Sequence, residues 1–433
     1  MKEDFLYYLW ENRLFTKELE TITKQPVQVI TTGYRNTNSG PDFMEAKIKI
    51  GEQVWAGQVE IHVKTSDWNR HGHQYDKAYG NVVLHVVYEN DVWVNNIPVV
   101  ALKGHFDETL YHSYQRLVES KRWIACERDM GKVQPYTLLS MLDRMAIERI
   151  AVKSEAVSRL LNASKFDWEG TFYQLVLRYF GLKVNSEASE YLSHILPLKT
   201  LLKHADNLTQ IEAMLFGCAG FLTKDFTEEY PQLLKREFSV MRAKFGLLTM
   251  PEERWKFMRM RPVNFPTIRI AQIAQLIHKN GCMFAKIREA DTIEQIRTLF
   301  DVKASAYWDT HYRFPTTTNT IGPSRQDKQK PNQNDSPTAK RIGDGTIDVL
   351  IINAVIPLLF CYGKYHKDER YCEQALRFWE STNAEDNTVV RDFARNGITA
   401  TNAMQSQALL HLYNHYCKRK RCLECSIGNV ILH

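Results

Sequence analysis

The chain has 433 residues, of which 44% are hydrophobic and 24% are charged, and its formal net charge is +6 at pH 7. This length is about two to three times that of a usual domain, so we expect two or three separate cores. The composition is that of an ordinary folded protein and excludes a disordered, collagen-like or disulfide-stapled chain. The mild positive charge permits a polyanionic partner without requiring one.

The first residues and the apolar stretches predict a cytoplasmic protein. Residues 1–10 place two acids directly after one lysine and lack the basic, apolar and small-residue order of a signal peptide. The longest apolar stretch, 349–362, is interrupted by Asn353 and Pro357. It is also shorter than the roughly 20 residues that cross a bilayer. The sequence therefore predicts no membrane span.

Strands dominate the first hundred residues. Apolar residues at helical spacing predict a short helix over 5–10. Runs rich in β-branched and aromatic residues then predict strands at 27–31, 43–50, 54–64 and 82–88. A hairpin is expected over 92–102, with its turn at Asn95 and Asn96.

From Asp107 onward the apolar residues recur with the period of helices. One segment breaks this pattern, because it is rich in Pro, Asn, Gln, Ser and Lys and nearly free of large apolar side chains. The predicted fold class is α+β, with an N-terminal α/β domain that has a mixed sheet, followed by a larger all-α region. The predicted parts are an α/β domain, a helical domain, a flexible linker or loop and a C-terminal helical segment, at 1–125, 126–315, 316–343 and 344–433.

One face of the predicted strand 54–64 carries ionisable side chains. Because strand side chains alternate, Glu60, His62 and Lys64 point to one face while the intervening apolar residues enter the core. An ordinary half-buried strand alternates in the same way. The position of the neighbouring strand therefore decides whether this face is a site.

The turn before this strand brings a second acid to the same face. If the chain reverses around residue 52, Asp42 lies opposite His62 and close to Glu60. Two carboxylates this close repel each other, so we expect a divalent cation between them, Mg²⁺ or Mn²⁺. Such an ion polarises a phosphate and lowers the pKa of a bound water, while Lys64 stabilises charge and His62 acts as ligand or base.

The segment 40–64 resembles the core of the PD-(D/E)XK, or restriction-endonuclease-like, nuclease superfamily. The Pro-Asp pair at 41–42 matches the first acidic motif and Glu60 matches the second. His62 stands where the pattern has lysine, and Lys64 follows two residues later. The resemblance implies a restriction-endonuclease-like α/β domain that hydrolyses phosphodiester bonds in DNA or RNA, with these acids as magnesium ligands.

Further distinctive motifs are GPDF at 40–43, VEIHVKTSDW at 59–68, HGH at 71–73, NVVLHVVYEND at 81–91, RPVNFPTIRIAQIA at 261–274 and CLECSIG at 422–428. Over nearly its whole length the chain thereby resembles an uncharacterised bacterial family, catalogued as domain of unknown function 2851. That family brings no established activity. The chemistry therefore has to be argued from the residues.

A short polar loop after the strand offers an additional site. His71, His73 and Asp67 lie within it. The two histidines either add metal or phosphate contacts or serve only the structure. Glu3 and Glu11 on the predicted first helix are available to complete the acid set, but we interpret both as parts of a solvated helix face.

Basic residues in the helical region indicate a nucleic-acid partner. Arg259, Arg261 and Arg269 follow one another closely and either contact phosphates or belong to solvated helix faces. Two functions stay open: a divalent-metal-dependent nuclease or other nucleic-acid-processing enzyme, and a catalytically inactive nuclease-like scaffold that binds nucleic acid or protein. In a third interpretation the charged residues of the hairpin form a purely structural network.

Three cysteines cluster near the end of the chain, at Cys417, Cys422 and Cys425. The basic residues 418–421 are expected to lower the pKa of these thiols and so to favour binding of a soft or borderline ion. Cys126, His411 or His415 is the candidate fourth ligand. The spacing fits zinc and an iron–sulfur cluster equally well, and three ordinary reduced cysteines are the alternative.

Overall fold

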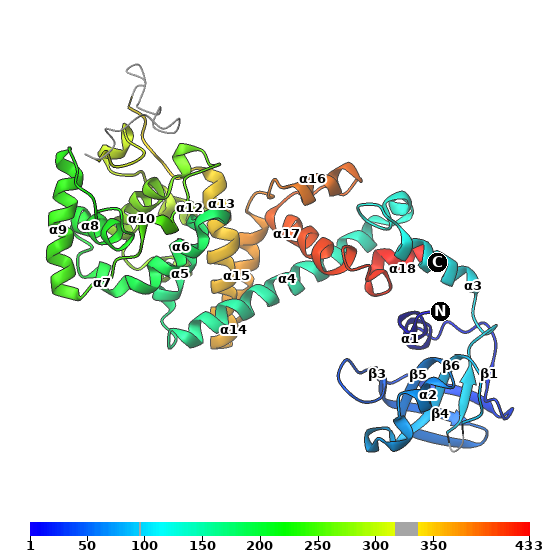
Figure 1. Cartoon of the computed structure of the whole chain (residues 1–433). Helices are drawn as coiled ribbons and strands as arrows, with labels where there is room; N and C mark the ends of the chain where they lie inside the picture. The colour runs from blue at the N-terminus through cyan, green and yellow to red at the C-terminus, as the bar shows by residue number, and fades with distance from the viewer. Residues whose placement is uncertain (95–96, 317–336) are drawn as a thin grey trace. The chain divides into compact units, whose positions relative to one another are not determined.

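The computed structural model of the chain describes residues 1–94, 97–316 and 337–433 (Figure 1). The turn predicted at Asn95 and Asn96, and all but the ends of the predicted linker 316–343, lie outside the described residues. The chain divides into two units. The N-terminal unit comprises Met1–Leu142 together with Leu412–His433, and the helical unit comprises Asp143–His411. The predicted division into four parts stays a prediction.

A mixed seven-stranded sheet lies in the N-terminal unit (Figure 1). Its strands are β1 (Leu19–Glu20), β2 (Pro26–Thr31), β3 (Tyr34–Arg35), β4 (Phe43–Ile50), β5 (Gln53–Lys64), β6 (Val82–Glu89) and β7 (Val99–Ala101). The order is β1-β2-β4-β5-β6-β7, and β3 pairs with β4. Strand β4 pairs antiparallel with β2 and with β5, whereas β6 pairs in parallel with β5 and with β7. The hairpin expected over 92–102 is wrong, because residues 92–94 form no strand and β7 pairs in parallel with β6.

Short helices accompany the sheet in the N-terminal unit. They are α1 (Glu3–Glu11), α2 (Asp67–Arg70), η1 (His73–Tyr75), η2 (Lys77–Tyr79), α3 (Glu108–Glu119), η3 (Glu127–Lys132), η8 (Leu412–Cys417), η9 (Cys422–Glu424) and α18 (Ser426–Leu432). The helix predicted from the apolar spacing of 5–10 is confirmed as α1, which buries Phe5, Leu6, Leu9 and Trp10 completely. Helix α1 contacts β5, the strand that carries the predicted site.

The helical unit confirms the predicted largely helical remainder of the chain. Its helices include α5 (Trp168–Phe180), α6 (Leu182–Ile195), α7 (Leu198–Leu202), α8 (Leu208–Cys218), α9 (Glu229–Phe245), α10 (Pro266–Asn280), α11 (Met283–Glu289), α12 (Ile293–Phe300), α15 (Glu369–Glu380), α16 (Thr388–Arg395) and α17 (Ala403–His411). Helix α4 (Pro135–Ala163) contains the boundary between the two units. The chain as a whole is therefore an α+β protein.

One helical stretch, Asp344–His366, is long and apolar enough to cross a membrane, but 61% of its most apolar window is buried inside the protein. Such burial is typical of a core helix in a soluble protein. Asn353 and Pro357, which interrupt the apolar stretch of the sequence, both lie within this helical stretch. The π-helical segment Ile351–Val355 links α13 (Asp344–Leu350) to α14 (Ile356–His366), so the proline stands in the first turn of α14.

The turn between β4 and β5 is tighter than the sequence predicts. Ile50 pairs with Gln53, so that only Gly51 and Glu52 form the turn. A two-residue turn fixes the pairing of the two strands that follow it. The register near the turn therefore differs by one residue from the predicted register centred on residue 52.

Candidate metal centre

Hydrogen bonds from backbone amides to side chains connect Asp42 and Glu60 across the β4–β5 hairpin. The amide of Asp42 donates to Glu60 Oε2 at 3.1 Å, and the amide of Ile61 donates to Asp42 Oδ2 at 2.9 Å. A β-bulge next to this pair shifts the register, and Glu45 within it has φ +57°. Asp42 therefore lies beside Glu60, and the predicted position opposite His62 is wrong.

Burial raises the pKa of both acids. Glu60 is 5% exposed, and burial followed by the charge of Asp42 raises its pKa to about 8. Burial also raises the pKa of Asp42, although the hydrogen bonds from Ile61 and the Tyr7 hydroxyl oppose that change. Buried carboxylates that repel each other are stabilised by a divalent cation. Each acid keeps one oxygen that its backbone amide partner does not use.

Three histidines lie close together beside Glu60. The ligand atoms of His62, His71 and His73 all lie within 4.8 Å of one another. His62 Nε2 is 3.1 Å from His71 Nδ1 and 3.4 Å from Glu60 Oε1, and His73 Nε2 is 3.3 Å from the same glutamate oxygen. Neighbouring ligands of a tetrahedral ion lie about 3.3 Å apart when the metal–ligand bonds are about 2.0–2.1 Å long. These three distances therefore match those between the ligands of one ion.

A fourth histidine fixes the orientation of His62. The Nδ1 atom of His62 lies 2.9 Å from Nε2 of His85, which is fully buried on β6 beside Glu60 in the parallel ladder. When His62 Nδ1 carries the proton, its Nε2 keeps a lone pair for an ion. Burial lowers the pKa of His62 to about 4 and that of His85 to about 3, so both rings are neutral at pH 7.

The loop after β5 presents the other two histidines. Gly72 separates His71 from His73 and has φ +75°, a conformation that glycine adopts without strain. The ring of His73 stacks on Tyr79 with centroids 3.8 Å apart, and it also contacts the buried ring of Trp68. The His73 side chain is 10% exposed, and its Nε2 atom has no hydrogen-bond partner within the described residues. That nitrogen is therefore aimed at the shared centre.

Two other predicted residues do not join the donor atoms. Asp67 Oδ2 accepts a hydrogen bond from the amide of Lys64 at 3.1 Å, and Asp67 Oδ1 pairs with Arg70 at 2.7 Å. The buried Asp67 thus shapes the loop. Lys64 is exposed and pairs in the ladder with Glu89 at the end of β5. This position does not support the charge-stabilising role that the sequence predicts for Lys64.

Glu3 on helix α1, which was predicted to be exposed to solvent, lies near the site. Glu3 is partly buried, and its pKa is raised by burial and by the charge of Asp42 and lowered by the charge of His71. Glu3 and Tyr7 are one helical turn apart, so both side chains reach the same acid. This spacing was visible in the sequence, but the packing of α1 on β5 was not. Glu11 is exposed, as expected.

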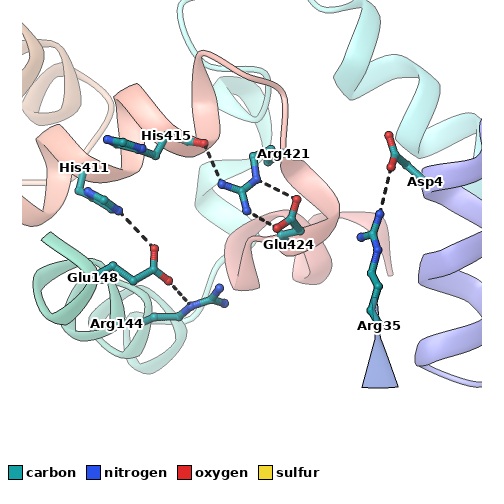
Figure 2. A network of polar contacts seen from close by, with 8 residues as sticks. All are labelled: Asp4, Arg35, Arg144, Glu148, His411, His415, Arg421 and Glu424. Atoms are coloured by element: carbon teal, nitrogen blue, oxygen red, sulfur yellow. Dashed lines mark hydrogen bonds and ion pairs between the residues drawn. The ribbon is translucent and has the colours of Figure 1, made fainter. Parts of the chain in front are cut away.

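Arg35 on β3 supplies positive charge to the site. Its guanidinium lowers the pKa of Asp42, in opposition to burial. The group lies over the ring of Tyr7 at 4.6 Å and pairs with Asp4 at 3.3 Å, as Figure 2 shows for the ion pair. The sequence places Arg35 in a polar stretch that reads as a loop, so no motif indicated its role.

A family model described as "Protein of unknown function (DUF2851)" matches residues 3–388. The chain belongs to this family. The resemblance drawn from the motifs is therefore confirmed, whereas the likeness to nucleases is not addressed by this match. No curated protein and no solved structure matches the chain. Because the family description states no activity, the geometry of the site carries the functional argument.

One of the three arginines predicted to bind nucleic acid is buried. Arg269 is 6% exposed, and its guanidinium donates to Gln272 at 2.9 Å and to Asn264 at 2.7 Å. Its assignment to a nucleic-acid surface is corrected, because the group faces the core of the helical unit. Arg259 and Arg261 are exposed. Their role in binding stays a prediction.

The four cysteines of the predicted cluster, Cys126, Cys417, Cys422 and Cys425, all belong to the N-terminal unit. Burial, with a further contribution from neighbouring thiols, raises the pKa of Cys126 to about 12 and that of Cys422 to about 11. The expectation that residues 418–421 lower these pKa values is wrong. The charge of Lys420 opposes the rise only in part.

The two histidines proposed as alternative fourth ligands make other contacts. His411 Nε2 lies 3.2 Å from Glu148 in the helical unit, and Glu148 also pairs with Arg144 (Figure 2). The carbonyl of His415 accepts a hydrogen bond from Arg421 in the N-terminal unit (Figure 2). The charges of Cys425 and Cys422 contribute to the raised pKa of Cys126.

Proposed function

We propose that the N-terminal unit is a divalent-metal-dependent phosphodiesterase that acts on nucleic acid. The observation that carries this proposal is the cluster of His62, His71 and His73 with Glu60 Oε1 next to two of these histidines, beside the second acid Asp42. The resemblance of 40–64 to PD-(D/E)XK nucleases supports the substrate class. It also supports a restriction-endonuclease-like description of the sheet domain.

The donor set favours zinc over the magnesium predicted from the sequence. Imidazole nitrogens suit zinc and other late transition ions, whereas Mg²⁺ prefers oxygen donors in octahedral geometry. A magnesium ion between Asp42 and Glu60 could use only the second oxygen of each acid, because a backbone amide already occupies the first. Mn²⁺ accepts both oxygen and nitrogen donors and is the second candidate ion.

The side chains around the centre have distinct roles in this proposal. A bound divalent ion would polarise a phosphate oxygen and lower the pKa of a water molecule. Asp42, which the Ile61 amide and the Tyr7 hydroxyl hold in place, would accept the proton of the attacking water. Arg35 would offset the negative charge of the phosphate, the role that the sequence assigned to Lys64.

A catalytically inactive scaffold for nucleic acid or protein is the second candidate. The structural use of the acids favours it, because Asp42 and Glu60 each accept a hydrogen bond from a backbone amide of the hairpin. A purely structural network explains those bonds. It does not explain why Glu60 Oε1 and His73 Nε2 face each other at 3.3 Å without forming a hydrogen bond.

The test is cleavage of labelled single-stranded DNA, double-stranded DNA and RNA by the full-length chain. The protein is stripped with a chelator and reloaded with Zn²⁺, Mn²⁺ or Mg²⁺. We expect ion-dependent cleavage that falls at least about 100-fold in Glu60→Gln and in His73→Ala. Glu52→Gln is the matched control, because Glu52 lies on the exposed turn of the same hairpin.

Three outcomes separate the candidates. Loss of cleavage in both variants, with unchanged circular dichroism and normal activity of the control, supports the enzyme. Undiminished cleavage in the double variant removes Glu60 and His73 from the mechanism. Absence of cleavage with every ion, together with binding of nucleic acid that weakens as salt rises, supports the scaffold instead.

A further inference from the structure

The four cysteines of the N-terminal unit come from parts of the chain that are far apart in sequence. Cys126 directly precedes η3, Cys417 ends η8, Cys422 begins η9 and Cys425 directly precedes α18. Helix α18 contacts both η3 and η9, and η9 contacts both η8 and α3. Each of these elements is short and lacks a core of its own. Something other than helix length must therefore hold them together.

The C-terminal segment folds back tightly on itself around Cys422. The amide of Cys425 donates to the carbonyl of Cys422 at 3.3 Å, which closes a turn between the two thiols. Gly428 packs so closely on this turn that a Cβ atom there would lie 2.1 Å from the Cys422 carbonyl oxygen. Lys420 has φ +57° in the turn that separates Cys417 from Cys422. The backbone therefore folds 417–428 into a compact segment that carries three of the four cysteines.

Contacts beside the cysteines join this segment to the region of Cys126. The ring of Trp123 stacks on Tyr413, with centroids 4.8 Å apart and planes 16° from parallel. Lys420 Nζ donates to the carbonyl of Ser120 at 2.6 Å. Cys126 and the C-terminal cysteines therefore lie on two segments that pack side by side.

Cys425 is buried, whereas Cys126, Cys417 and Cys422 are partly buried. No disulfide joins any of the eight cysteines of the chain, all of which lie in described residues. A single buried thiol is common, but four thiols on short segments that pack against one another offer the donor set of a soft or borderline metal. Metal binding replaces their protons and removes the cost of burying thiolates.

We infer that Cys126, Cys417, Cys422 and Cys425 bind a closed four-thiolate metal centre, either a zinc ion or an iron–sulfur cluster. The centre is structural and independent of the proposed phosphodiesterase site. It fixes the C-terminal segment to the region that follows α3. Both kinds of centre accept four cysteine ligands, with three closely spaced and one distant in sequence.

The experiment measures zinc, iron and sulfide in the full-length chain after anaerobic purification. The protein carries His71→Ala and His73→Ala, so that an ion at the histidine centre does not contribute. We expect about one zinc per chain without colour, or iron with sulfide and broad visible absorption. Replacement of Cys126 or Cys417 by serine is expected to lower the metal content at least about tenfold. Cys282→Ser is the control, because Cys282 is exposed in the helical unit.

Alkylation of the folded parent protein covers the case in which a serine variant fails to fold. Cys126, Cys417, Cys422 and Cys425 should resist alkylation until a chelator is added, whereas the exposed Cys282 should react at once. Parent protein that contains neither zinc nor iron, with Cys126 and Cys417 alkylated in the folded state, overturns the inference. Metal that persists in Cys126→Ser but disappears in Cys417→Ser overturns the assignment of Cys126 as the distant ligand.

Discussion

Asp42 and Glu60 are joined by reciprocal hydrogen bonds, in which the amide of Asp42 donates to Glu60 and the amide that follows Glu60 donates to Asp42. The two acids therefore stabilise the hairpin as well as offering oxygens to an ion. An alanine at either position removes both properties together. Separating stability from chemistry requires variants that keep the hydrogen-bond acceptor.

Asp42→Ala is expected to destabilise the N-terminal unit, whereas Asp42→Asn is expected to retain most of its stability. Alanine leaves the Ile61 amide without its acceptor, and a buried unsatisfied amide costs about 1–3 kcal/mol. The side-chain oxygen of asparagine still accepts that hydrogen bond. Urea unfolding followed by circular dichroism measures the difference. Equal stability of the two variants would show that the bond does not support the hairpin.

His85→Ala should weaken metal binding although His85 does not face the ion. Loss of its contact with His62 Nδ1 frees the ring of His62 to rotate and to change tautomer. Removing such a partner lowers metal affinity by about 10- to 100-fold. Titration with Co²⁺ or Zn²⁺ gives the affinity of each variant. His112→Ala is the control, because His112 is exposed on α3 of the same unit.

The raised pKa of Glu212 predicts how the stability of the helical unit depends on pH. It is 1% exposed, accepts hydrogen bonds from Tyr230 and Ser305, and burial raises its pKa to about 7. In the unfolded chain its pKa returns to about 4.5. Between these two values the folded state binds more protons than the unfolded state. The stabilising contribution is therefore complete below about pH 4.5 and is lost as the pH rises through 7.

The size of this loss follows from the difference between the two pKa values. It amounts to about 3 kcal/mol at pH 8. Thermal unfolding at a series of pH values from 5 to 8 should show a falling stability in the parent. Glu212→Gln should remove this part of the slope, whereas Glu253→Gln, at an exposed position, should keep it. An identical slope in all three proteins would mean that Glu212 does not titrate in this range.

Apolar periodicity predicted the helix α1 and the strands β4, β5 and β6 because the burial of side chains sets both patterns. The register of the hairpin could not be predicted in the same way. Glu45 adopts a left-handed conformation that the sequence does not signal, since non-glycine residues rarely do so. The bulge and the tighter turn each shift the register by one residue, so Asp42 lies two positions from its predicted partner. Local pattern thus gave the residues of the site without their exact pairing.

Long-range packing explains what else the sequence did not reveal. Glu3 appeared solvated because nothing in its helix shows that α1 docks on β5. Arg269 appeared exposed because it stands in a basic stretch, yet its neighbours in the fold supply polar partners that let it be buried. His71 and His73 were named as an additional site. Their convergence with Glu60 depends on the path of the loop between them.

Gly72 determines that path, and its replacement gives a sharp test of the histidine centre. Gly72 lies between the two histidines and has φ +75°. A Cβ atom at this position would meet no other atom within 4 Å. Valine avoids this conformation at a cost of about 1–2 kcal/mol, so the loop is expected to shift, whereas asparagine tolerates it. We expect Gly72→Val to weaken Zn²⁺ or Co²⁺ binding at least about tenfold and Gly72→Asn to preserve it.

Gly104 provides the matched control, because it has φ +76° in equally open space in the same unit. Gly104→Val should therefore carry a similar backbone strain without changing the affinity for metal. The affinities come from titrations of full-length protein in which Cys126 and Cys417 are replaced by serine, so that thiol ligands do not contribute. Unchanged binding in Gly72→Val would show that His71 and His73 do not hold the ion together. Equal weakening in Gly104→Val would trace the effect to general destabilisation, because only Gly72 lies between the two histidines.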